Sequence, residues 1–306
     1  MDILTRLIQM ARPQASVDLR CQLSGAYRIP HSAAPDGIAP FHLVLRGSCR
    51  FETARGLLTA QEGDFVLFPR GGVHTVLDDG APGDLAVTRM RYDGMLPLRR
   101  AGKGPVEVDL LCGHFEHAGG PGELLFRSLP DPLLASLSEG SSRVLLQAVV
   151  KLIREEATAQ RPGALAIVTA LSQTLLAMAL RRYGERSNGE ANILALLADA
   201  RLGASVQALL KDPGHPWTIE ALGEFAAMSR ASYARRFREA AGMTVFEFMT
   251  RTRMAIACDL LRSTRRNVGD ICMEVGYQSE AAFGRAFKQH MAEMPGQYRR
   301  RQKGTP

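Results

Sequence analysis

Two stretches near the end of the chain decide its fold: IEALGEFAAMSRASYARRFREAAG (residues 219–242) and VGDICMEVGYQSEAAFGRAFKQHMA (residues 268–292). They form an internal repeat, offset by 49 residues in the first part and by 50 after an inserted Gln278. Each copy predicts a short helix, a tight turn, an N-cap serine (Ser229 or Ser279) and a second helix. That order is the helix-turn-helix pattern, whose second helix lies in the major groove of DNA. The sequence therefore predicts helix-turn-helix units at about residues 219–241 and 268–291.

The second helix of each unit has an inward and an outward face. Tyr233 and Phe237 are expected to point inward. The outward positions are Arg230, Ala231, Ala234, Arg235 and Arg238 in the first unit, and Glu280, Ala281, Gly284, Arg285 and Lys288 in the second. Because arginine pairs bidentately with guanine, these faces are candidate DNA-binding surfaces. A continuous helix at about residues 246–263 would place them roughly one DNA turn, ~34 Å, apart. The alternative is an ordinary helical bundle. It is disfavoured because the internal repeat, the N-cap serines and the local positive charge all indicate helix-turn-helix units.

The positive charge of the chain is concentrated in its last third. Residues 217–306 hold 15 Lys and Arg against 9 Asp and Glu, a net of +6 out of +7 for all 306 residues. A basic domain beside a nearly neutral one suggests a polyanionic partner at one end. The charge distribution alone would equally fit a basic surface that only keeps the protein soluble.

Composition narrows the class of protein. With 46% hydrophobic and 23% charged residues, the chain is typical of a soluble protein of two domains. The N-terminal MDILTRLIQM carries Asp2 and Arg6 inside its apolar run, unlike a signal peptide. The longest apolar run, Ala164–Leu180, is short and polar for a membrane span, which favours a buried or dimer-interface helix. The five cysteines form no CxxC pair. We therefore expect a cytoplasmic protein with reduced thiols and no membrane association.

The first part of the chain reads as β-rich. Short segments rich in Val, Leu and Phe, separated by Gly, Pro and Asp turns, predict a barrel or sandwich over about residues 15–125. Helical periodicity follows at about residues 141–183. There the expected apolar stripe is Val144, Leu145, Ala148 and Leu152, and the expected polar face is Lys151, Arg154 and Glu155. The polar segment GERSNGEAN (residues 184–192) predicts a boundary near residue 190. The predicted fold class is α+β multidomain, with domains at residues 1–190 and 191–306.

A second motif lies in the β-rich part. GDFVLFPRGGVH (residues 63–74) fits G-x5-P-x-G-x2-H, which resembles the second motif of the cupin barrel. The first cupin motif should supply HxH and a glutamate, but His42 is followed by Val44, and the register of Glu52 is uncertain. A metal site needs three or four ligands.

His42 and His74 therefore need a third ligand, which DLLCGHFEH (residues 109–117) could supply through His114 or Cys112. The alternative is that the histidines only form hydrogen bonds inside a degenerate scaffold. No other cofactor is expected.

The segment WTIEALGEF…PGQYRR (residues 217–300) strongly resembles the AraC/XylS family of bacterial transcription regulators, over about residues 201–301. The resemblance implies base contacts from Ala231, Ala234, Arg235, Glu280, Ala281 and Arg285. The small alanines would leave readout by the first unit mainly to Arg235, with thymine methyl contacts from the alanines. Cys272 stands where the family has a small residue. The family also implies a homodimer, promoter DNA as the partner, activation and recruitment of RNA polymerase.

The N-terminal layout resembles the cupin branch of this family, and within it activators of enterobacteria that respond to reactive chlorine. The resemblance includes MDILTRLI, Cys21 with IPH (residues 29–31) following, Cys112-Gly, and DPGHPWTIE. It implies oxidant sensing by Cys21 and Cys112. A sensor thiol must be partly exposed and partly thiolate, and Arg20 and His114 could lower the pKa of these thiols.

Several readings stay open at this point. Cys21 and Cys112 could instead be small apolar fillers, and Cys49 is expected to be structural. The barrel lumen could bind a small organic effector or a metal while the cysteines are incidental. A metal-dependent cupin enzyme is the remote alternative; the incomplete first motif and the two helix-turn-helix units argue against it, and we expect no enzyme activity.

Overall fold

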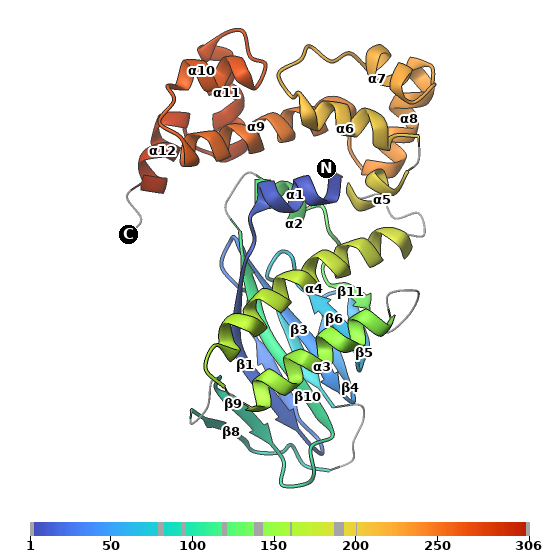
Figure 1. The fold of residues 1–306 in the computed structure, drawn as a ribbon, viewed down its shortest axis with the longest axis vertical. Helices are drawn as coiled ribbons and strands as arrows, with labels where there is room; N and C mark the ends of the chain where they lie inside the picture. The colour runs from blue at the N-terminus through green and yellow to red at the C-terminus, as the bar shows by residue number, and fades with distance from the viewer. Residues whose placement is uncertain are drawn as a thin grey trace. The chain divides into compact units, whose positions relative to one another are not determined.

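The computed structural model describes residues 3–78, 83–92, 96–117, 121–137, 143–159, 161–186, 193–199 and 201–303. By contacts the chain divides into two compact units (Figure 1). A barrel unit comprises residues 13–116 and 130–183, and a helical unit comprises residues 1–12, 117–129 and 184–306. The predicted fold class, a cupin-like β domain and an all-α helix-turn-helix domain, is confirmed. The boundary near residue 190 stays a prediction.

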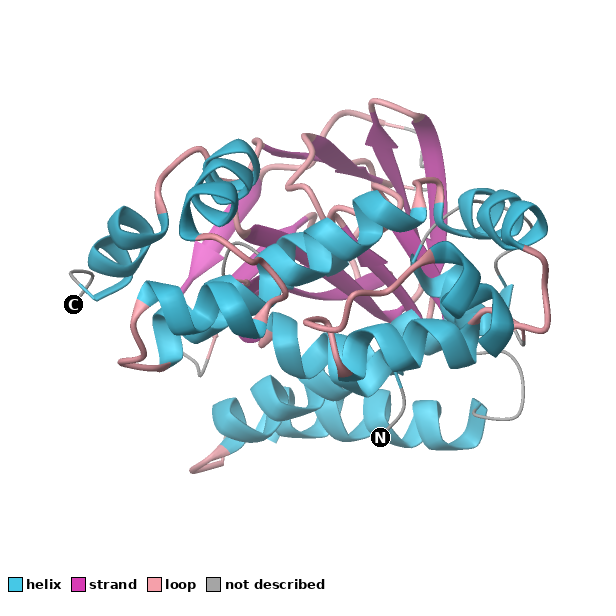
Figure 2. Ribbon diagram, turned by 90° about the horizontal axis from the view of Figure 1, so that it is seen from above, coloured by secondary structure: helices cyan, strands magenta, loops and turns pink. Residues whose placement is uncertain are grey.

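All strands of the described residues belong to the barrel unit (magenta in Figure 2). They are β1 (Gln14–Leu23), β2 (Arg28–His31), β3 (Ile38–Arg46), β4 (Ser48–Thr53), β5 (Gly56–Gln61), β6 (Asp64–Leu67), β7 (His74–Leu77), β8 (Thr88–Arg91), β9 (Leu98–Ala101), β10 (Val108–Glu116) and β11 (Leu133–Ser136). One sheet has the order β11-β6-β3-β10-β1-β9-β8, and the other has the order β2-β7-β4-β5. Buried side chains from both sheets, including Val44, Phe51 and Val76, form the core between them.

The glycines of the motif at residues 63–74 mark backbone turns. Gly63 precedes β6 with a φ of 86°, and Gly71 precedes β7 with a φ of 66°. A side chain at Gly71 would also meet the Cβ of Ala34 at 2.8 Å. Glycine adopts such a backbone most readily, so Gly71 suits the turn that leads to His74 at the first position of β7.

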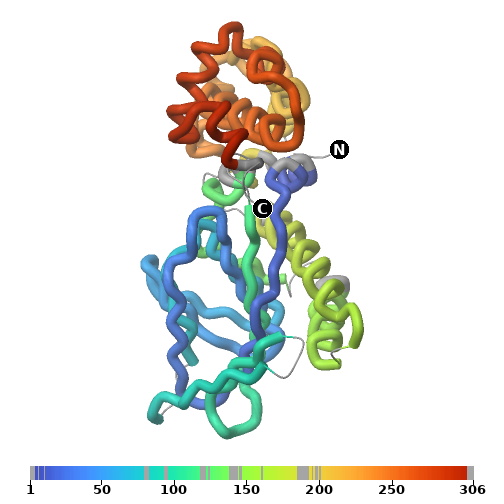
Figure 3. Tube along the Cα trace, turned by 90° about the vertical axis from the view of Figure 1, so that its left-hand side faces the viewer, coloured from blue at the N-terminus to red at the C-terminus, as the bar shows by residue number. Residues whose placement is uncertain are grey.

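Two helices, α3 (Arg143–Ala159) and α4 (Ala164–Arg186), lie along the seven-stranded sheet (Figures 1 and 3). The predicted apolar stripe of α3 is wrong. Val144 and Leu152 are 76% and 40% exposed, whereas Val150 and Ile153 are buried. The side chain of Leu145 lies outside the described residues, and Ala148 is exposed. The helix carries two apolar stripes, and periodicity alone did not indicate which one packs.

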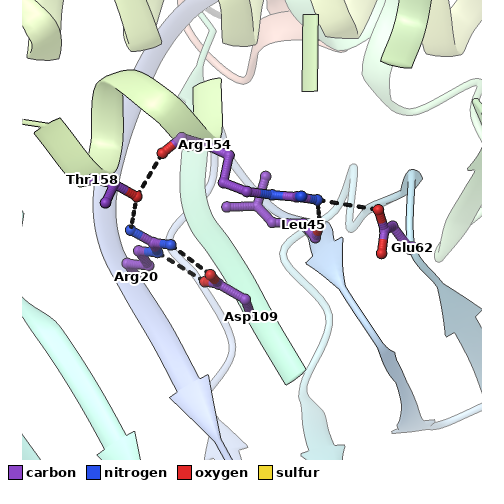
Figure 4. A network of polar contacts seen from close by, with 6 residues as sticks. All are labelled: Arg20, Leu45, Glu62, Asp109, Arg154 and Thr158. Atoms are coloured by element: carbon purple, nitrogen blue, oxygen red, sulfur yellow. Dashed lines mark hydrogen bonds and ion pairs between the residues drawn. The ribbon is translucent and has the colours of Figure 1, made fainter. Parts of the chain in front are cut away.

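The contacts of Arg154 account for which face of α3 packs against the barrel. Its guanidinium donates to the carbonyl of Leu45 and, at 3.1 Å, to Glu62 (Figure 4). This places a residue expected on the polar face against the barrel. A long arginine stem can pack on apolar surface while its charged head finds acceptors, which a hydrophobicity pattern does not reveal.

Arg20 completes this polar network between α3 and the barrel. Its Nε and Nη2 donate to the two oxygens of Asp109 at 2.8 and 2.5 Å, and its Nη1 donates to Thr158 at 3.0 Å (Figure 4). The side chains of Arg20 and Asp109 are only 12% and 7% exposed. The pair is therefore a largely buried, bidentate ion pair that joins β1, β10 and α3.

The described part of the helical unit has no strands. Its helices are α1 (Ile3–Ala11), α2 (Pro121–Phe126), α5 (Ile193–Ala198), α6 (Gly203–Lys211), α7 (Ile219–Phe225), α8 (Arg230–Ala241), α9 (Val245–Ser263), α10 (Val268–Glu274), α11 (Glu280–Met291) and α12 (Pro295–Lys303). The first two come from the N-terminal half of the sequence. Helix α1 contacts α2, α5, α6 and α9, and α2 contacts α9. The membership of α1 and α2 in this unit was not predicted.

The repeat is visible in the backbone of the helical unit. Ser229 and Ser279 cap α8 and α11 by accepting from the amides of Ser232 and Ala282, as predicted. The turn before each cap contains a residue with positive φ, Ala227 at 50° and Gly276 at 85°. Helix α9 joins the two halves, close to its predicted bounds.

Candidate DNA-binding surface and buried thiol–histidine cluster

Helices α8 and α11 present the outward faces that the repeat predicts. Tyr233 and Phe237 are fully buried, and so are their counterparts Phe283 and Phe287. The predicted DNA-binding residues that are exposed are Arg230, Ala231, Arg235, Arg238, Glu280, Ala281, Arg285 and Lys288; Ala234 is half-buried. The prediction that Gly284 lies on the outward face is wrong. Gly284 is buried, and a Cβ there would lie 3.1 Å from the Cε of Met294.

The arginines of these faces differ in how they are held. Arg230 forms an ion pair with Glu220 at 2.8 Å, whereas Arg235 approaches Glu239 only to 4.0 Å. Arg285 forms no ion pair with any residue that the structure describes. Exposed pairs of this kind contribute at most about 1 kcal/mol, so Arg235 and Arg285 can turn to an external acceptor at little cost.

The barrel core holds a thiol pair. Cys21 on β1 and Cys112 on β10 are 2% and 4% exposed, and their Sγ atoms lie 3.9 Å apart. The two residues are diagonal neighbours on antiparallel strands, since Cys21 is in register with Leu110 and Cys112 with Leu19. Cys49 is buried in the same core. The structure brings the two predicted redox residues together but not, as a sensor thiol requires, to the surface.

Arg99 is the cation that acts on this thiol pair. It lies directly opposite Cys21 on the parallel strand β9. The hydrogen bond from Cys112, opposed by burial and helped by the charge of Arg99, lowers the pKa of the Cys21 thiol. The hydrogen bond to Cys21 and burial raise the pKa of Cys112 well above its ordinary value. Cys21 is therefore the better nucleophile and Cys112 the proton donor.

Three histidines lie beside the thiols. His42 is in register with Cys112 on the seven-stranded sheet, and His31 is in register with His74 on the four-stranded sheet. Across the barrel, the Nε2 atoms of His42 and His74 are 2.8 Å apart. The Nδ1 of His42 lies 3.1 Å from the Sγ of Cys112, and the rings of His31 and His74 stack at 4.7 Å. The core thus contains one chain of polar contacts from thiol to imidazoles.

Burial keeps these imidazoles neutral. Burial, with the charges of His74 and Arg99, lowers the pKa of His31 to about 4. Burial also lowers the pKa of His42 well below its usual range, and that of His74 against an opposing hydrogen bond to Gly72. Neutral imidazole is the form that accepts protons or binds metals.

Comparison with known proteins gives the context of this site. The Cupin family matches residues 2–185, and a helix-turn-helix domain family matches residues 222–301. An uncharacterized HTH-type transcriptional regulator of Haemophilus influenzae is 32% identical over 300 residues, covering 98% of this chain and 99% of that protein. The RCS-specific HTH-type transcriptional activator RclR of Escherichia coli is 30% identical over 305 residues, covering 98% of both chains.

The chain belongs to the AraC-type family of transcription regulators, with a cupin domain. The HTH-type transcriptional regulator MtrA of Neisseria gonorrhoeae is similarly related, at 31% identity over 309 residues and 98% of both chains. The resemblance to regulators that respond to reactive chlorine is thereby confirmed, and the protein is a transcription regulator with a DNA-binding helix-turn-helix domain.

In this AraC-type regulator the structure places three sequence candidates away from the thiols. Arg20 is bound to Asp109 on the α3 side of the sheet. Glu52 is paired with the exposed Arg28. His114 contacts Asp18 and Glu116 and not His42. Its Nδ1 lies 2.7 Å from a carboxylate oxygen of Asp18, which stands where the register of β1 is irregular. The prediction that Glu52 or His114 could complete a metal site with His42 and His74 is therefore wrong.

His31 and Arg99 are the residues of this site that sequence reasoning missed. Both reach it through strand pairing, His31 opposite His74 and Arg99 opposite Cys21. The only sequence signal was the IPH segment that follows Cys21. A two-residue alternation cannot report which strand is a neighbour, so neither side chain could be placed from the sequence.

The His114 ion pair predicts a pH dependence of stability. Burial by itself would lower the pKa of His114, but the carboxylates of Asp18 and Glu116 outweigh it and raise that pKa above 6.5. The charged form is therefore stabilised in the folded state; the gain is complete below about pH 6.5 and is lost as the pH rises through the folded pKa. His114→Gln should be less stable than wild type by up to about 1 kcal/mol near pH 6 and equal to it near pH 9. Urea unfolding at both pH values measures this, and a constant difference would contradict it.

Proposed function

We propose that this protein is a sequence-specific DNA-binding regulator, acting as an activator that recruits RNA polymerase at promoters in the cytoplasm. The observation that carries the proposal is the pair of capped recognition helices α8 and α11 with exposed arginines. Both lie in the basic part of the chain. The relatives MtrA and RclR are named as a transcriptional regulator and an activator, which supports this role.

Arg235→Ala tests base readout. The variant should lose about 1–3 kcal/mol of binding to its preferred DNA and relax its preference at one or two base pairs. Arg236→Ala is the matched control on the same helix, because Arg236 is bound to Asp199 at 2.7 Å. Fluorescence anisotropy with a library of promoter sequences measures both. Unchanged selectivity of Arg235→Ala, or a flat dependence of wild-type affinity on salt, would contradict DNA readout by α8.

We further infer that the signal is oxidation of the Cys21–Cys112 pair. Hypochlorous acid transfers chlorine to the Cys21 thiolate and releases hydroxide. The Cys112 thiol then attacks this sulfur, chloride leaves, a proton is lost, and a disulfide forms. The lowered pKa of Cys21 and the Sγ separation of 3.9 Å suit these two roles. The name of RclR, an RCS-specific activator, agrees with such a signal.

Burial of the pair limits the class of oxidant. Both cysteines are less than 5% exposed, so a large or charged oxidant is excluded while a small neutral one can diffuse in. Diagonal residues of adjacent strands lie roughly 7–8 Å apart, beyond the ~4.4–6.8 Å that disulfides span. Closing the bond would therefore draw β1 and β10 together. This movement is the conformational signal that oxidation would produce.

An organic effector in the barrel lumen is the less favoured alternative. The space between the sheets is filled by Tyr27, Phe51 and Phe68, which are fully buried. A pocket does lie beneath α3, lined by Glu62, Gly63, Leu137, Gln147, Val150, Lys151 and Arg154. It is outside the core that holds the thiols. Enzyme activity is likewise not proposed; turnover of a substrate by the full chain would revive it.

We also propose a homodimer formed through the outer faces of α3 and α4. Helix α4 is long and apolar enough to cross a membrane by length and composition alone, and 39% of that window is buried. Its buried positions, among them Val168 and Leu175, form one stripe, while Leu165 and Ile167 are 44% and 40% exposed. Together with Val144 and Leu152 they leave apolar surface of the kind that a partner covers.

Leu152→Glu tests this interface. Burying a carboxylate against a second copy should raise the dimer dissociation constant about tenfold or more, at least ~1.4 kcal/mol. Leu57→Glu, at a leucine of β5 that is 56% exposed against 40% for Leu152, should leave it unchanged. Light scattering coupled to gel filtration over a concentration series measures both. A wild-type monomer at all concentrations, or equal effects of both variants, would contradict the proposal.

A further inference from the structure

The two steps of the proposed disulfide chemistry do not use the histidine cluster. His31, His42 and His74 each offer one ring nitrogen, and these atoms all lie within 4.8 Å of one another. His42 and His74 are each 2% exposed, and His31 is half-buried. Three imidazoles of one core therefore converge on a small volume between the two sheets.

The hydrogen-bond partners indicate where the ring protons lie. The Nδ1 of His74 donates to the carbonyl of Gly72 at 2.9 Å, so its Nε2 carries a lone pair. When the Cys112 thiol donates to Cys21, the sulfur of Cys112 accepts from the Nδ1 of His42, 3.1 Å away. The Nε2 of His42 then also carries a lone pair. In this tautomer the two lone pairs face each other at 2.8 Å, an arrangement that a bound cation stabilises; in the other tautomer of His42 its Nε2 donates to the Nε2 of His74.

The spacing fits a metal ion if His42 and His74 separate slightly and the nitrogen of His31, within 4.8 Å of theirs, moves closer. Tetrahedral zinc with nitrogen ligands at about 2.0–2.1 Å holds them ~3.3 Å apart, so His42 and His74 need to separate by about half an ångström. The His74–Gly72 contact is the backbone hydrogen bond that typically orients a ligating imidazole. The only nearby candidate carboxylate from the motif, Glu52, is engaged by Arg28. The donor set is therefore nitrogen, which excludes magnesium and calcium.

We propose that His31, His42 and His74 bind one divalent transition-metal ion of the zinc class. The ion would take one imidazole nitrogen from each residue. Arg99, opposite Cys21 on β9, adds positive charge to this part of the barrel, which opposes a second cation. The metal and the thiol pair share His42, because a metal on Nε2 holds the proton of that ring on Nδ1, facing Cys112. This site goes beyond the proposed regulator function.

Metal binding to the reduced full-length protein tests the site directly. Protein stripped by a chelator is titrated with Co²⁺, followed by visible absorption, and then with Zn²⁺ in competition; bound metal is counted by elemental analysis. We expect one ion per chain. His31→Ala, His42→Ala and His74→Ala should each weaken binding by about 100-fold or more. His114→Ala, which removes a histidine of the same barrel outside the cluster, should not change it.

Three outcomes would overturn the site. The wild type binds no Co²⁺ with a dissociation constant below about 100 μM; a variant lacking all three histidines binds as wild type; or Cys21→Ser and Cys112→Ser abolish binding while the histidine variants retain it. The His42 and His74 variants change buried side chains and could lose their folded circular dichroism spectrum. In that case His31→Asn, a change at the half-buried end of β2, tests the site. DNA affinity is recorded for the wild type and for every variant, so a wild type that binds DNA but no metal refutes this site and leaves the regulator function standing.

Discussion

Arg20→Met is expected to lower the free energy of unfolding of the barrel unit by about 3–5 kcal/mol. The substitution leaves Asp109, whose side chain is 7% exposed, without the two hydrogen bonds that stabilise its charge. It also removes the bond from Arg20 to Thr158, which ties the end of α3 to β1. Urea unfolding followed by circular dichroism measures the loss through the midpoint and slope.

Two controls separate a buried ion pair from a general effect of removing an arginine. Arg28→Met removes the exposed pair with Glu52 and should cost at most about 1 kcal/mol. The double variant Arg20→Met, Asp109→Leu should recover most of the lost stability, because apolar side chains of similar volume replace both charges. If Arg20→Met and Arg28→Met are equally mild, the network of Figure 4 does not hold α3 to the barrel.

The second large effect is expected on the response to oxidant. Cys21→Ser and Cys112→Ser should each abolish it, because a disulfide needs both sulfurs and a serine hydroxyl is not oxidised. In wild type, about one equivalent of hypochlorous acid should remove two hydrogens and join the peptides of Cys21 and Cys112. Intact mass and peptide mapping measure the bond, and a promoter fusion measures the response.

Cys49 provides the matched control, since it is buried in the same core and has no proposed role. Cys49→Ala should respond as wild type. Cys21→Ala and Cys112→Ala should behave as the serine variants, which excludes an effect of the buried hydroxyl. DNA binding by the reduced variants shows that they fold. A response that survives without Cys21 would leave the thiol pair a structural feature of the core.

The helix-turn-helix units could be predicted because their signals are local. Ser229, Ser279 and the inward aromatics each act within one or two helical turns, so their spacing in the sequence is their spacing in the structure. The outward position predicted for Gly284 was wrong because of a contact outside its own helix: Met294, in the segment that follows, covers it.

The barrel site was predictable only in part. Cys21, Cys112, His42 and His74 were identified from family resemblance and the cupin motif, and the structure brings them together. Their electrostatic partners were not. His114 lies two residues beyond Cys112 on β10, where it meets Asp18 at the irregular position of β1 and lies outside the cluster. Register of this kind depends on distant strands, which no short pattern encodes.

The membership of α1 and α2 in the helical unit restricts how this architecture can be cut or recombined. The backbone passes between the units four times, after residues 12, 116, 129 and 183. A fragment beginning near residue 190 would lose the two helices that pack against α9, and with them buried side chains such as Leu7 and Phe126. If residues from about 190 onward were joined to a different domain, the apolar surface that α1 and α2 cover would therefore be exposed. The two units are therefore expected to be inherited together, and the three relatives align with this chain over 98% or more of their own length.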